Sequence, residues 1–273
     1  MQIDHVYALY FSPTGNTALA ARTVAHKLAE RFDAPCSEID ITLPAAHAKP
    51  HTFGPGDFVV AAGPTYAGKL PNKMLPYYQE QLHGCGALAA AVVTFGNRSF
   101  DNSLAELCAV LQKNEFCPVG AGAFVGTHAF SDKLAPGRPG AEDLQALREF
   151  ADAVAAKVLA AQGPLSAVQP TGDAAAPYYV PKGVDGQPAK FLKAKPLTHE
   201  DRCTGCGLCA QECPMGSIDM ADPKQVTGVC IKCQSCVRKC PHGAKYFTDE
   251  AFLSHIAMLE QNFTRPAENA VFV

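Results

Sequence analysis

The sequence has no excess of basic residues, no long apolar run and no basic leader. Its 273 residues include 23 Lys and Arg against 26 Asp and Glu, a net charge of −3 at pH 7. Proteins that bind nucleic acid usually show a basic excess or stripe, so nucleic-acid binding is not expected. The longest uncharged apolar run, Gly86 to Phe95, is too short to cross a bilayer. The start, Met1 to His5, lacks the pattern of a signal peptide, so we expect a cytoplasmic protein without membrane insertion.

Cysteine, by contrast, is abundant and clustered. Eight of the 12 cysteines fall between Cys203 and Cys240, in two copies of the pattern C-x2-C-x2-C-x3-C-P at an offset of 27 residues. Three thiolates at this spacing can surround one face of an iron–sulfur cube. Zinc sites favour two separated cysteine pairs, and disulfides are rare in a reducing cytosol, so both alternatives are less favoured.

Residues 197–247 resemble the bacterial two-cluster ferredoxins in this repeated motif. The resemblance implies a small α+β unit holding two [4Fe–4S] clusters. In such ferredoxins the fourth cysteine of each run ligates the opposite cluster. The predicted ligand sets are therefore Cys203, Cys206, Cys209 and Cys240 for one cluster, and Cys213, Cys230, Cys233 and Cys236 for the other.

The first 163 residues show strand and helix patterns in alternation. Apolar segments typical of buried strands occupy residues 6–11, 37–42, 57–63, 87–95 and 116–125. Apolar positions spaced three and four apart predict helices at residues 17–32, 101–113 and 144–158. Such alternation favours a doubly wound α/β fold, with a five-stranded parallel sheet covered by helices on both faces.

The loop after the first strand runs from Ser12 to Thr17 and leads directly into a helix. Hydroxyls, a glycine and free backbone N–H groups at a helix N-terminus form a phosphate cradle without any lysine. The loop is similar to the S/T-x-T-G-N-T phosphate loop of flavodoxins, which implies FMN, although an ordinary capped helix has the same outline. Two further loops, residues 63–71 and 94–101, should reach the same sheet edge.

The residues expected to contact FMN come from these three loops. Tyr66 is expected to stack on the flavin ring, unless it is only a packing aromatic. The complete predicted set is Ser12, Thr14, Gly15, Asn16, Thr17, Pro64, Thr65, Tyr66, Ala67, Gly68, Thr94, Phe95, Gly96, Asn97 and Arg98.

Two other glycine patterns suggest nucleotides but lack the required context. The segment from Gly63 to Lys69 mimics a triphosphate loop, but Leu70 stands where a magnesium-binding Ser or Thr is needed. The glycines at 120 and 122 do not open a helix, so no NAD(P) site is expected.

The whole chain resembles the flavodoxin–ferredoxin fusion proteins called ferrodoxins. The expected parts are a flavodoxin-like FMN-binding domain (1–163), a linker (164–196), a two-cluster ferredoxin (197–248), and a C-terminal helix and tail (249–273). The resemblance implies electron transfer between FMN, the two clusters and unidentified redox partner proteins, with no catalytic side chain because the cofactors carry the chemistry. The alternatives are a flavin-dependent reductase, with Tyr66 or His128 as proton donor, and a subunit of a larger redox complex. The apolar stripe of the helix at 249–263 is expected to dock on the flavin domain.

Overall fold

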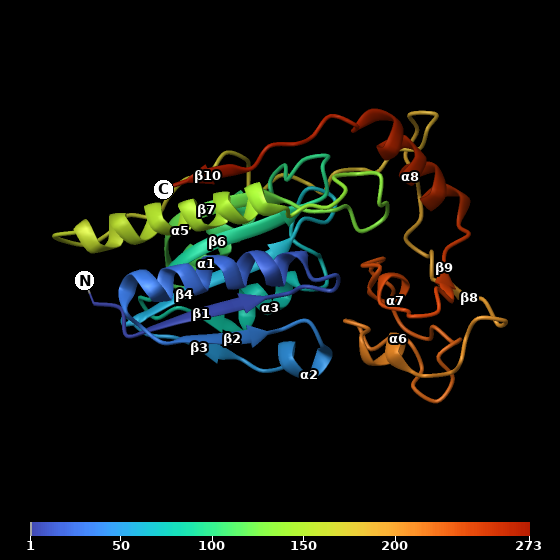
Figure 1. Ribbon diagram of the computed structural model, residues 1–273, viewed down its shortest axis with the longest axis horizontal. Helices are drawn as coiled ribbons and strands as arrows, with labels where there is room; N and C mark the ends of the chain where they lie inside the picture. The colour runs from blue at the N-terminus through green and yellow to red at the C-terminus, as the bar shows by residue number, and fades with distance from the viewer. Residues whose placement is uncertain (1) are drawn as a thin grey trace.

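Five parallel strands form most of the main sheet in the computed structural model, which describes residues 2–273 (Figure 1). Their order is β2-β1-β4-β6-β7, the order of flavodoxin-like sheets. The predicted fold class is therefore confirmed. The strands are β1 (His5–Tyr10), β2 (Cys36–Asp40), β4 (Asp57–Pro64), β6 (Leu88–Phe95) and β7 (Cys117–Val125).

A sixth strand, β10 (Ala270–Phe272), makes the sheet mixed, so the prediction of a purely parallel five-stranded sheet was one strand short. The tail returns to the outer edge of β7 and pairs with it in the antiparallel direction, Val271 opposite Gly122. The pairing satisfies the open edge of β7. A three-residue strand with a partner so distant in sequence leaves no periodic signal.

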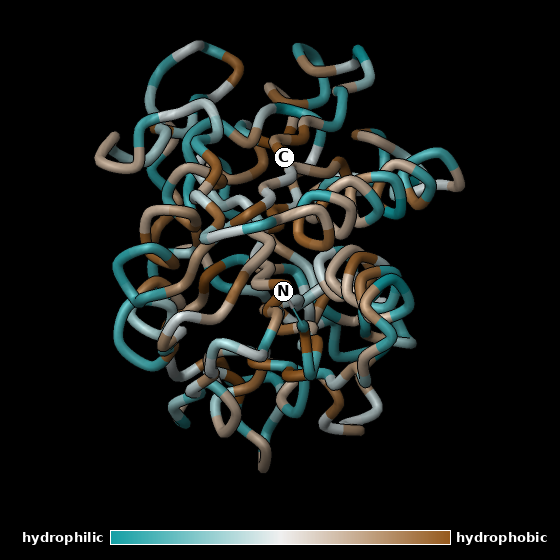
Figure 2. Tube along the Cα trace, turned by 90° about the vertical axis from the view of Figure 1, so that its left-hand side faces the viewer, coloured by the Kyte–Doolittle hydropathy of each residue, from teal (hydrophilic) through white to brown (hydrophobic). Residues whose placement is uncertain are grey.

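Helices cover both faces of the sheet and create two separate cores (Figures 1 and 2). Helices α1 (Asn16–Phe32) and α5 (Ala141–Ala160) bury their apolar stripes on one face, and α3 (Leu75–Glu80) and α4 (Ser103–Lys113) on the other. Alternate side chains of β1 serve the two cores, with Ala8 in the first and Leu9 in the second. Two short elements complete this part: α2 (Pro44–His47) and a small sheet of β3 (His51–Thr52) and β5 (Leu82–His83).

The predicted linker, residues 164–196, lies along the flavodoxin-like part. The backbone N–H of Val168 donates to Pro118 O at 2.8 Å, and that of Tyr179 donates to Ala67 O at 2.8 Å. The Tyr178 hydroxyl donates to Leu70 O at 2.8 Å. These bonds fix a segment that composition alone would leave as a semi-rigid tether.

The cysteine-rich part is small and has little regular structure. Its strands β8 (Leu197–Thr198) and β9 (Lys245–Tyr246) pair antiparallel, and its helices are α6 (Leu208–Gln211) and α7 (Ser235–Arg238). Each helix carries the third cysteine of one motif copy.

Helix α8 (Glu250–Asn262) follows and docks on the flavodoxin-like part, as its apolar stripe predicts. The Asp249 carboxylate caps it by accepting from the backbone N–H of Phe252 at 2.9 Å. Met258 and Leu259 pack on Leu134. Glu260 accepts hydrogen bonds from Ser131 and Lys133 at 2.6 and 2.7 Å.

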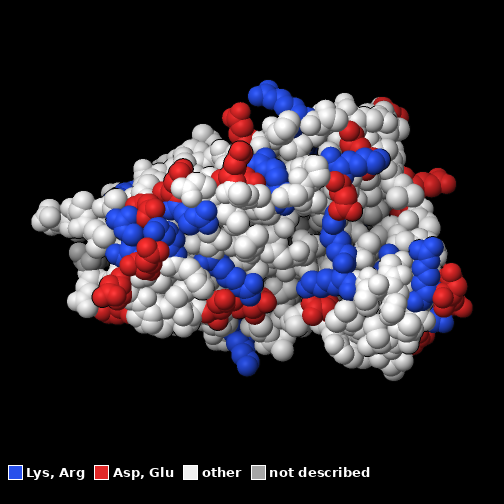
Figure 3. All heavy atoms as spheres, viewed as in Figure 1, with Lys and Arg blue, Asp and Glu red and all other residues white. Residues whose placement is uncertain are grey.

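Two whole-molecule properties accord with the composition. No helix that residues 2–273 form has both the length and the apolar character that crossing a membrane demands. On the face seen in Figure 3, basic and acidic side chains are interspersed.

Candidate cofactor sites

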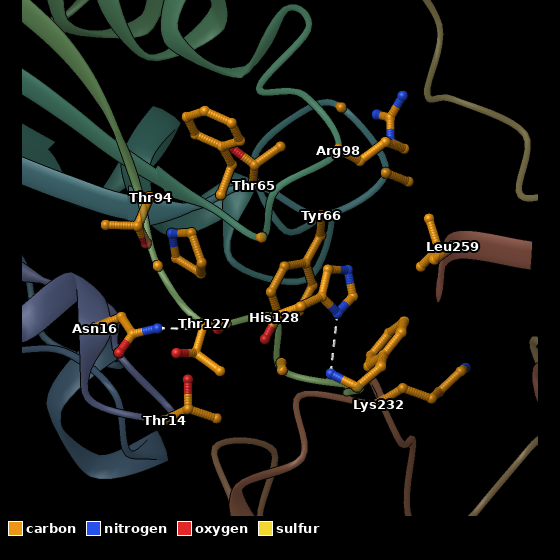
Figure 4. A pocket seen from close by; sticks show the side chains of 18 of the residues that line it. Thr14, Asn16, Thr65, Tyr66, Thr94, Arg98, Thr127, His128, Lys232 and Leu259 are labelled. Carbon is orange, nitrogen blue, oxygen red and sulfur yellow. Dashed lines mark hydrogen bonds between the residues drawn. The ribbon is translucent and has the colours of Figure 1, made fainter. Parts of the chain in front are cut away.

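A cavity of about 220 Å³ opens at the carboxyl edge of the sheet, where the loops after β1, β4 and β6 meet (Figure 4). Every residue of the predicted FMN set lines it except Ser12, Gly15 and Asn97. The topology explains this convergence, because the carboxyl ends of parallel strands share one edge.

The Ser12–Thr17 loop is braced from outside the cavity. The Ser12 hydroxyl accepts from the backbone N–H of Ala18 at 2.9 Å, and the Ser12 N–H donates to Thr42 Oγ1 at 2.9 Å. Gly15 stands at the N-cap of α1 with φ of 99°, a left-handed conformation that suits glycine, and has no side chain to cover the first N–H groups. The helix N-terminus therefore fits an anionic group.

Neighbouring polar side chains hold this loop against the adjacent strands. The hydroxyls of Thr17 and Thr94 lie 2.6 Å apart, and the Asn16 amide donates to Thr127 O at 3.1 Å. Thr14 also lines the cavity. The set of hydroxyls, amides and N–H groups suits a phosphomonoester such as that of FMN.

Asn97 has a structural role that its sequence position does not reveal. Its buried amide donates to the carbonyls of Phe263 and Arg265 at 2.5 and 3.1 Å, and its Oδ1 accepts from the N–H of Ala267 at 2.9 Å. The side chain thus anchors the C-terminal tail.

Lys69 also lies outside the cavity lining. It is buried, forms an ion pair with Glu106 at 2.9 Å, and donates to the carbonyls of Ala174 and Ala176 at 2.8 Å each. The lysine of the triphosphate-like motif therefore anchors the linker.

Residues that no local motif indicated complete the cavity. Phe130 follows β7, Ile231 and Lys232 belong to the second cysteine run, and the linker and α8 add the remaining walls. These last residues are Tyr179, Pro181, Phe191, His255 and Leu259. They come from segments far apart in the sequence, and the apolar stripe of α8 and the Tyr178-Tyr179 pair were the signals available for them.

Two histidines, the buried His255 and the partly buried His128, line this cavity in opposite tautomers. Burial, with the neighbouring His255, Arg238 and Arg98, lowers the pKa of His128 to about 4, and burial also lowers the pKa of His255. His128 Nδ1 accepts from the N–H of Phe130 at 3.0 Å, so a neutral ring carries its proton on Nε2. His255 Nδ1 lies 2.8 Å from Lys182 O, a carbonyl that can only accept, so this ring carries its proton on Nδ1.

Tyr66 lies near the middle of the labelled group in Figure 4. Burial raises the pKa of its phenol well above the usual value, and the nearby Cys233 and Cys230 raise it further. Tyr66 therefore stands close to the second cysteine run.

The eight clustered cysteines surround two small hollows, four around each. One hollow is lined by Cys203, Cys206, Cys209 and Cys240, and the other by Cys213, Cys230, Cys233 and Cys236. This is the crossed grouping that the ferredoxin resemblance implies. Within residues 2–273, no three His, Cys, Asp or Glu side chains meet as a single metal ion would need.

Burial dominates the electrostatics of these thiols. It raises the pKa of Cys233 to about 12, and it raises the pKa of Cys236 and Cys209 as well. The buried Lys245 opposes the rise at both Cys236 and Cys209, and its ammonium donates to Thr198 Oγ1 at 2.8 Å. A cation placed near both hollows would favour thiolate ligands and the negative charge of an iron–sulfur cluster.

A comparison with known protein families matches one segment of the cysteine-rich part. The 4Fe–4S binding domain family matches residues 196–219. No curated protein matches the sequence. The N-terminal part is therefore flavodoxin-like by its strand order, and the C-terminal part contains a ferredoxin-type segment.

Solved structures similar to this chain include several flavodoxins. The flavodoxin of Streptococcus pneumonia TIGR4 is 21% identical, with a TM-score of 0.37, and covers 56% of this chain and 99% of its own. Flavodoxin 2 from Bacillus cereus is 16% identical, with a TM-score of 0.40 and the same coverage. The apo form of an NADH:FMN oxidoreductase is 18% identical, with a TM-score of 0.42, and covers 59% of this chain and 92% of its own.

Proposed function

We propose that this protein transfers electrons between FMN in the large cavity and two [4Fe–4S] clusters, and exchanges them with redox partner proteins. The observation that carries the proposal is a shared wall. Ile231 and Lys232 line both the large cavity and the hollow of Cys213, Cys230, Cys233 and Cys236. Cofactors separated by one layer of side chains can exchange electrons without a domain movement.

The residues of each site suit the proposed group. Thr14 and the open N-terminus of α1 would hold the phosphate of FMN, and Tyr66 would lie against its ring. FMN supplies two electrons in single steps, and each cluster supplies one. The chain itself positions the groups, excludes water with Phe130 and Phe191, and supplies the compensating charge of Lys245.

A flavin-dependent reductase of a small acceptor is a second candidate. The observation that favours it is the fixed tautomer of His128, whose Nε2–H is available on a residue that lines the cavity. Rapid bleaching of the flavin by NADH or NADPH alone, or rapid turnover of a small acceptor without a partner protein, would favour this candidate.

Two measurements test the electron-transfer proposal. An anaerobic preparation should contain about eight irons and eight acid-labile sulfides per chain, and one FMN. After photoreduction of the flavin, the clusters should be reduced with a first-order rate that does not depend on protein concentration. Zinc without sulfide, or FAD in place of FMN, would contradict the assignment of the cofactors.

A further inference from the structure

The two copies of the cysteine motif have the same spacing but opposite environments. In the first copy, Thr204, Gly205 and Cys206 are all exposed to solvent. In the second copy, residues 232–236 are all buried. The pseudosymmetry of the sequence is therefore broken by burial against the rest of the chain.

The backbone shows that the second copy is adapted to burial. Both copies use left-handed φ values at matching positions, 70° and 75° at Gly205 and Gly207, and 56° and 67° at Lys232 and Gln234. Glycine adopts this conformation freely, whereas a residue with a side chain does so under strain. The second copy nevertheless carries side chains at both positions.

These side chains and their neighbours join the second copy to the rest of the molecule. The Lys232 ammonium donates to the linker carbonyl of Leu192 at 2.7 Å and to Cys230 O at 3.0 Å. Ile231 packs against a core of the flavodoxin-like part, whereas its counterpart Thr204 is exposed.

Helix α7 adds a polar anchor on the same side. Arg238 donates to the carbonyls of Ala129 and His128 at 2.8 and 2.7 Å, and forms an ion pair with Asp132 at 2.7 Å. All three partners belong to the loop after β7, which also lines the large cavity. The hollow of Cys203, Cys206, Cys209 and Cys240, by contrast, takes its lining from residues 203–245 alone among residues 2–273.

We infer that the two clusters act in a fixed order, an inference that rests on the proposed function. The inner cluster, held by Cys213, Cys230, Cys233 and Cys236, exchanges electrons with FMN. The outer cluster, held by Cys203, Cys206, Cys209 and Cys240, is the port to a protein that carries one electron at a time. The exposed segment from Thr204 to Cys206 is the contact surface. One electron passes from the reduced outer cluster to the acceptor. No proton is transferred, and no covalent bond is formed or broken.

Lysine substitutions at two open glycines test the port without removing a ligand. A Cβ at Gly205 or at Gly186 meets nothing within 4 Å, and both glycines have a positive φ, 70° and 74°, so a lysine carries the same backbone strain at either position. Gly186 is exposed and lies in the linker, outside the cysteine-rich part. Gly205→Lys also reproduces the residue of the second copy, Lys232. The reduced protein is mixed with a one-electron acceptor, either the cation hexaammineruthenium(III) or the anion ferricyanide.

Gly205→Lys should slow oxidation by the cation and accelerate oxidation by the anion, each by about threefold at low salt. Gly186→Lys should change neither rate. Equal effects from the two lysines, or no effect from Gly205→Lys, would overturn the port assignment.

A matched pair of ligand variants tests the order. Cys206→Ala and Cys233→Ala alter equivalent cysteines of the two copies, and each variant should retain about four irons. In Cys233→Ala, the photoreduced flavin should have no cluster to reduce. In Cys206→Ala, the flavin should still reduce the remaining cluster, but oxidation of the protein by hexaammineruthenium(III) should become the slow step. The reverse pattern would overturn the order. Absence of electron transfer from flavin to clusters in the unaltered protein would instead refute the proposed function. The two glycine-to-lysine variants would still test whether electrons leave through the outer cluster.

Discussion

At the scale of single residues, the structure separates side chains that line the cavity from side chains with structural contacts within one predicted set. Thr14 lines the cavity, whereas Ser12 braces the same loop from behind and Asn97 binds the C-terminal tail. All three belong to loops at the cofactor edge, so the sequence pattern cannot distinguish them. The direction of each side chain depends on partners that come from elsewhere in the chain.

Thr14→Ala is expected to weaken FMN binding. The substitution removes one hydroxyl that could donate to a charged phosphate, a bond worth about 1.5–3 kcal/mol. The change in FMN affinity is measured by titrating the apoprotein with FMN and monitoring the quenching of flavin fluorescence. Thr23→Ala is the matched control, because Thr23 is a partly exposed residue of α1 that does not line the cavity, and its hydroxyl donates to Leu19 O at 2.8 Å. An equal loss of affinity in both variants would mean that α1, and not the phosphate contact, is affected.

His128 is expected to make the stability of the protein depend on pH. Its pKa is about 4 in the folded protein and about 6.5 in an unfolded chain, so the unfolded state binds more protons between these values. The contribution is fully present above pH 6.5 and is lost as the pH falls toward 4, by up to about 1.4 kcal/mol per pH unit. Denaturant unfolding at several pH values should show a shallower slope for His128→Gln. An unchanged slope would mean that His128 does not titrate in this window.

At the scale of helices and strands, the sequence was most informative where a strong period repeats. The five parallel strands and α1, α4 and α5 follow from apolar periodicity, and the strand–loop–helix units bring the cofactor loops to one edge. Helix α3 was not predicted because it has only six residues, with Pro76 in its first turn and Pro71 shortly before it. Strand β10 escaped because three residues contain no period.

The cavity walls contributed by the linker, α8 and the second cysteine run could not be predicted for a related reason. His255 and Lys232 reach the cavity through tertiary packing, and no local pattern records which distant surface a side chain meets. The grouping of the cysteines, unlike these cavity walls, could be predicted from the sequence. Three cysteines of each set lie on one short loop, so local geometry decides most of the grouping.

The anchoring of β10 by Asn97 can be tested directly. Asn97 has φ of 63°, so Asn97→Gly removes the amide without adding backbone strain. Loss of the amide leaves the Phe263 and Arg265 carbonyls and the Ala267 N–H without these partners, at a cost of about 1–3 kcal/mol in the free energy of unfolding. Hydrogen exchange at Phe272 and Ala270 should accelerate. Unchanged exchange together with weakened FMN binding would restore the ligand role predicted from the sequence.

At the scale of the whole molecule, three segments outside the parallel sheet pack back onto the flavodoxin-like part. The linker is pinned along the flavodoxin-like part, α8 docks on the loop after β7, and the tail returns to the sheet as β10. The two cofactor regions are thus held together by three separate segments as well as by their own contact. A flexible tether would raise their mutual effective concentration, but it would not fix their distance.

Arg238→Ala tests how far this fixed distance matters. The substitution removes the bonds to the loop after β7 and leaves the cluster ligands in place, so internal electron transfer should become slower. It should remain first order, because the linker and α8 still hold the parts together. Arg202→Ala, at an exposed arginine of the same cysteine-rich part, is the matched control and should keep the rate of the unaltered protein. Photoreduction at several protein concentrations provides the measurement. A rate that increases in proportion to concentration would mean that the two parts exchange electrons by collision between molecules, and the shared wall would then have no role in transfer.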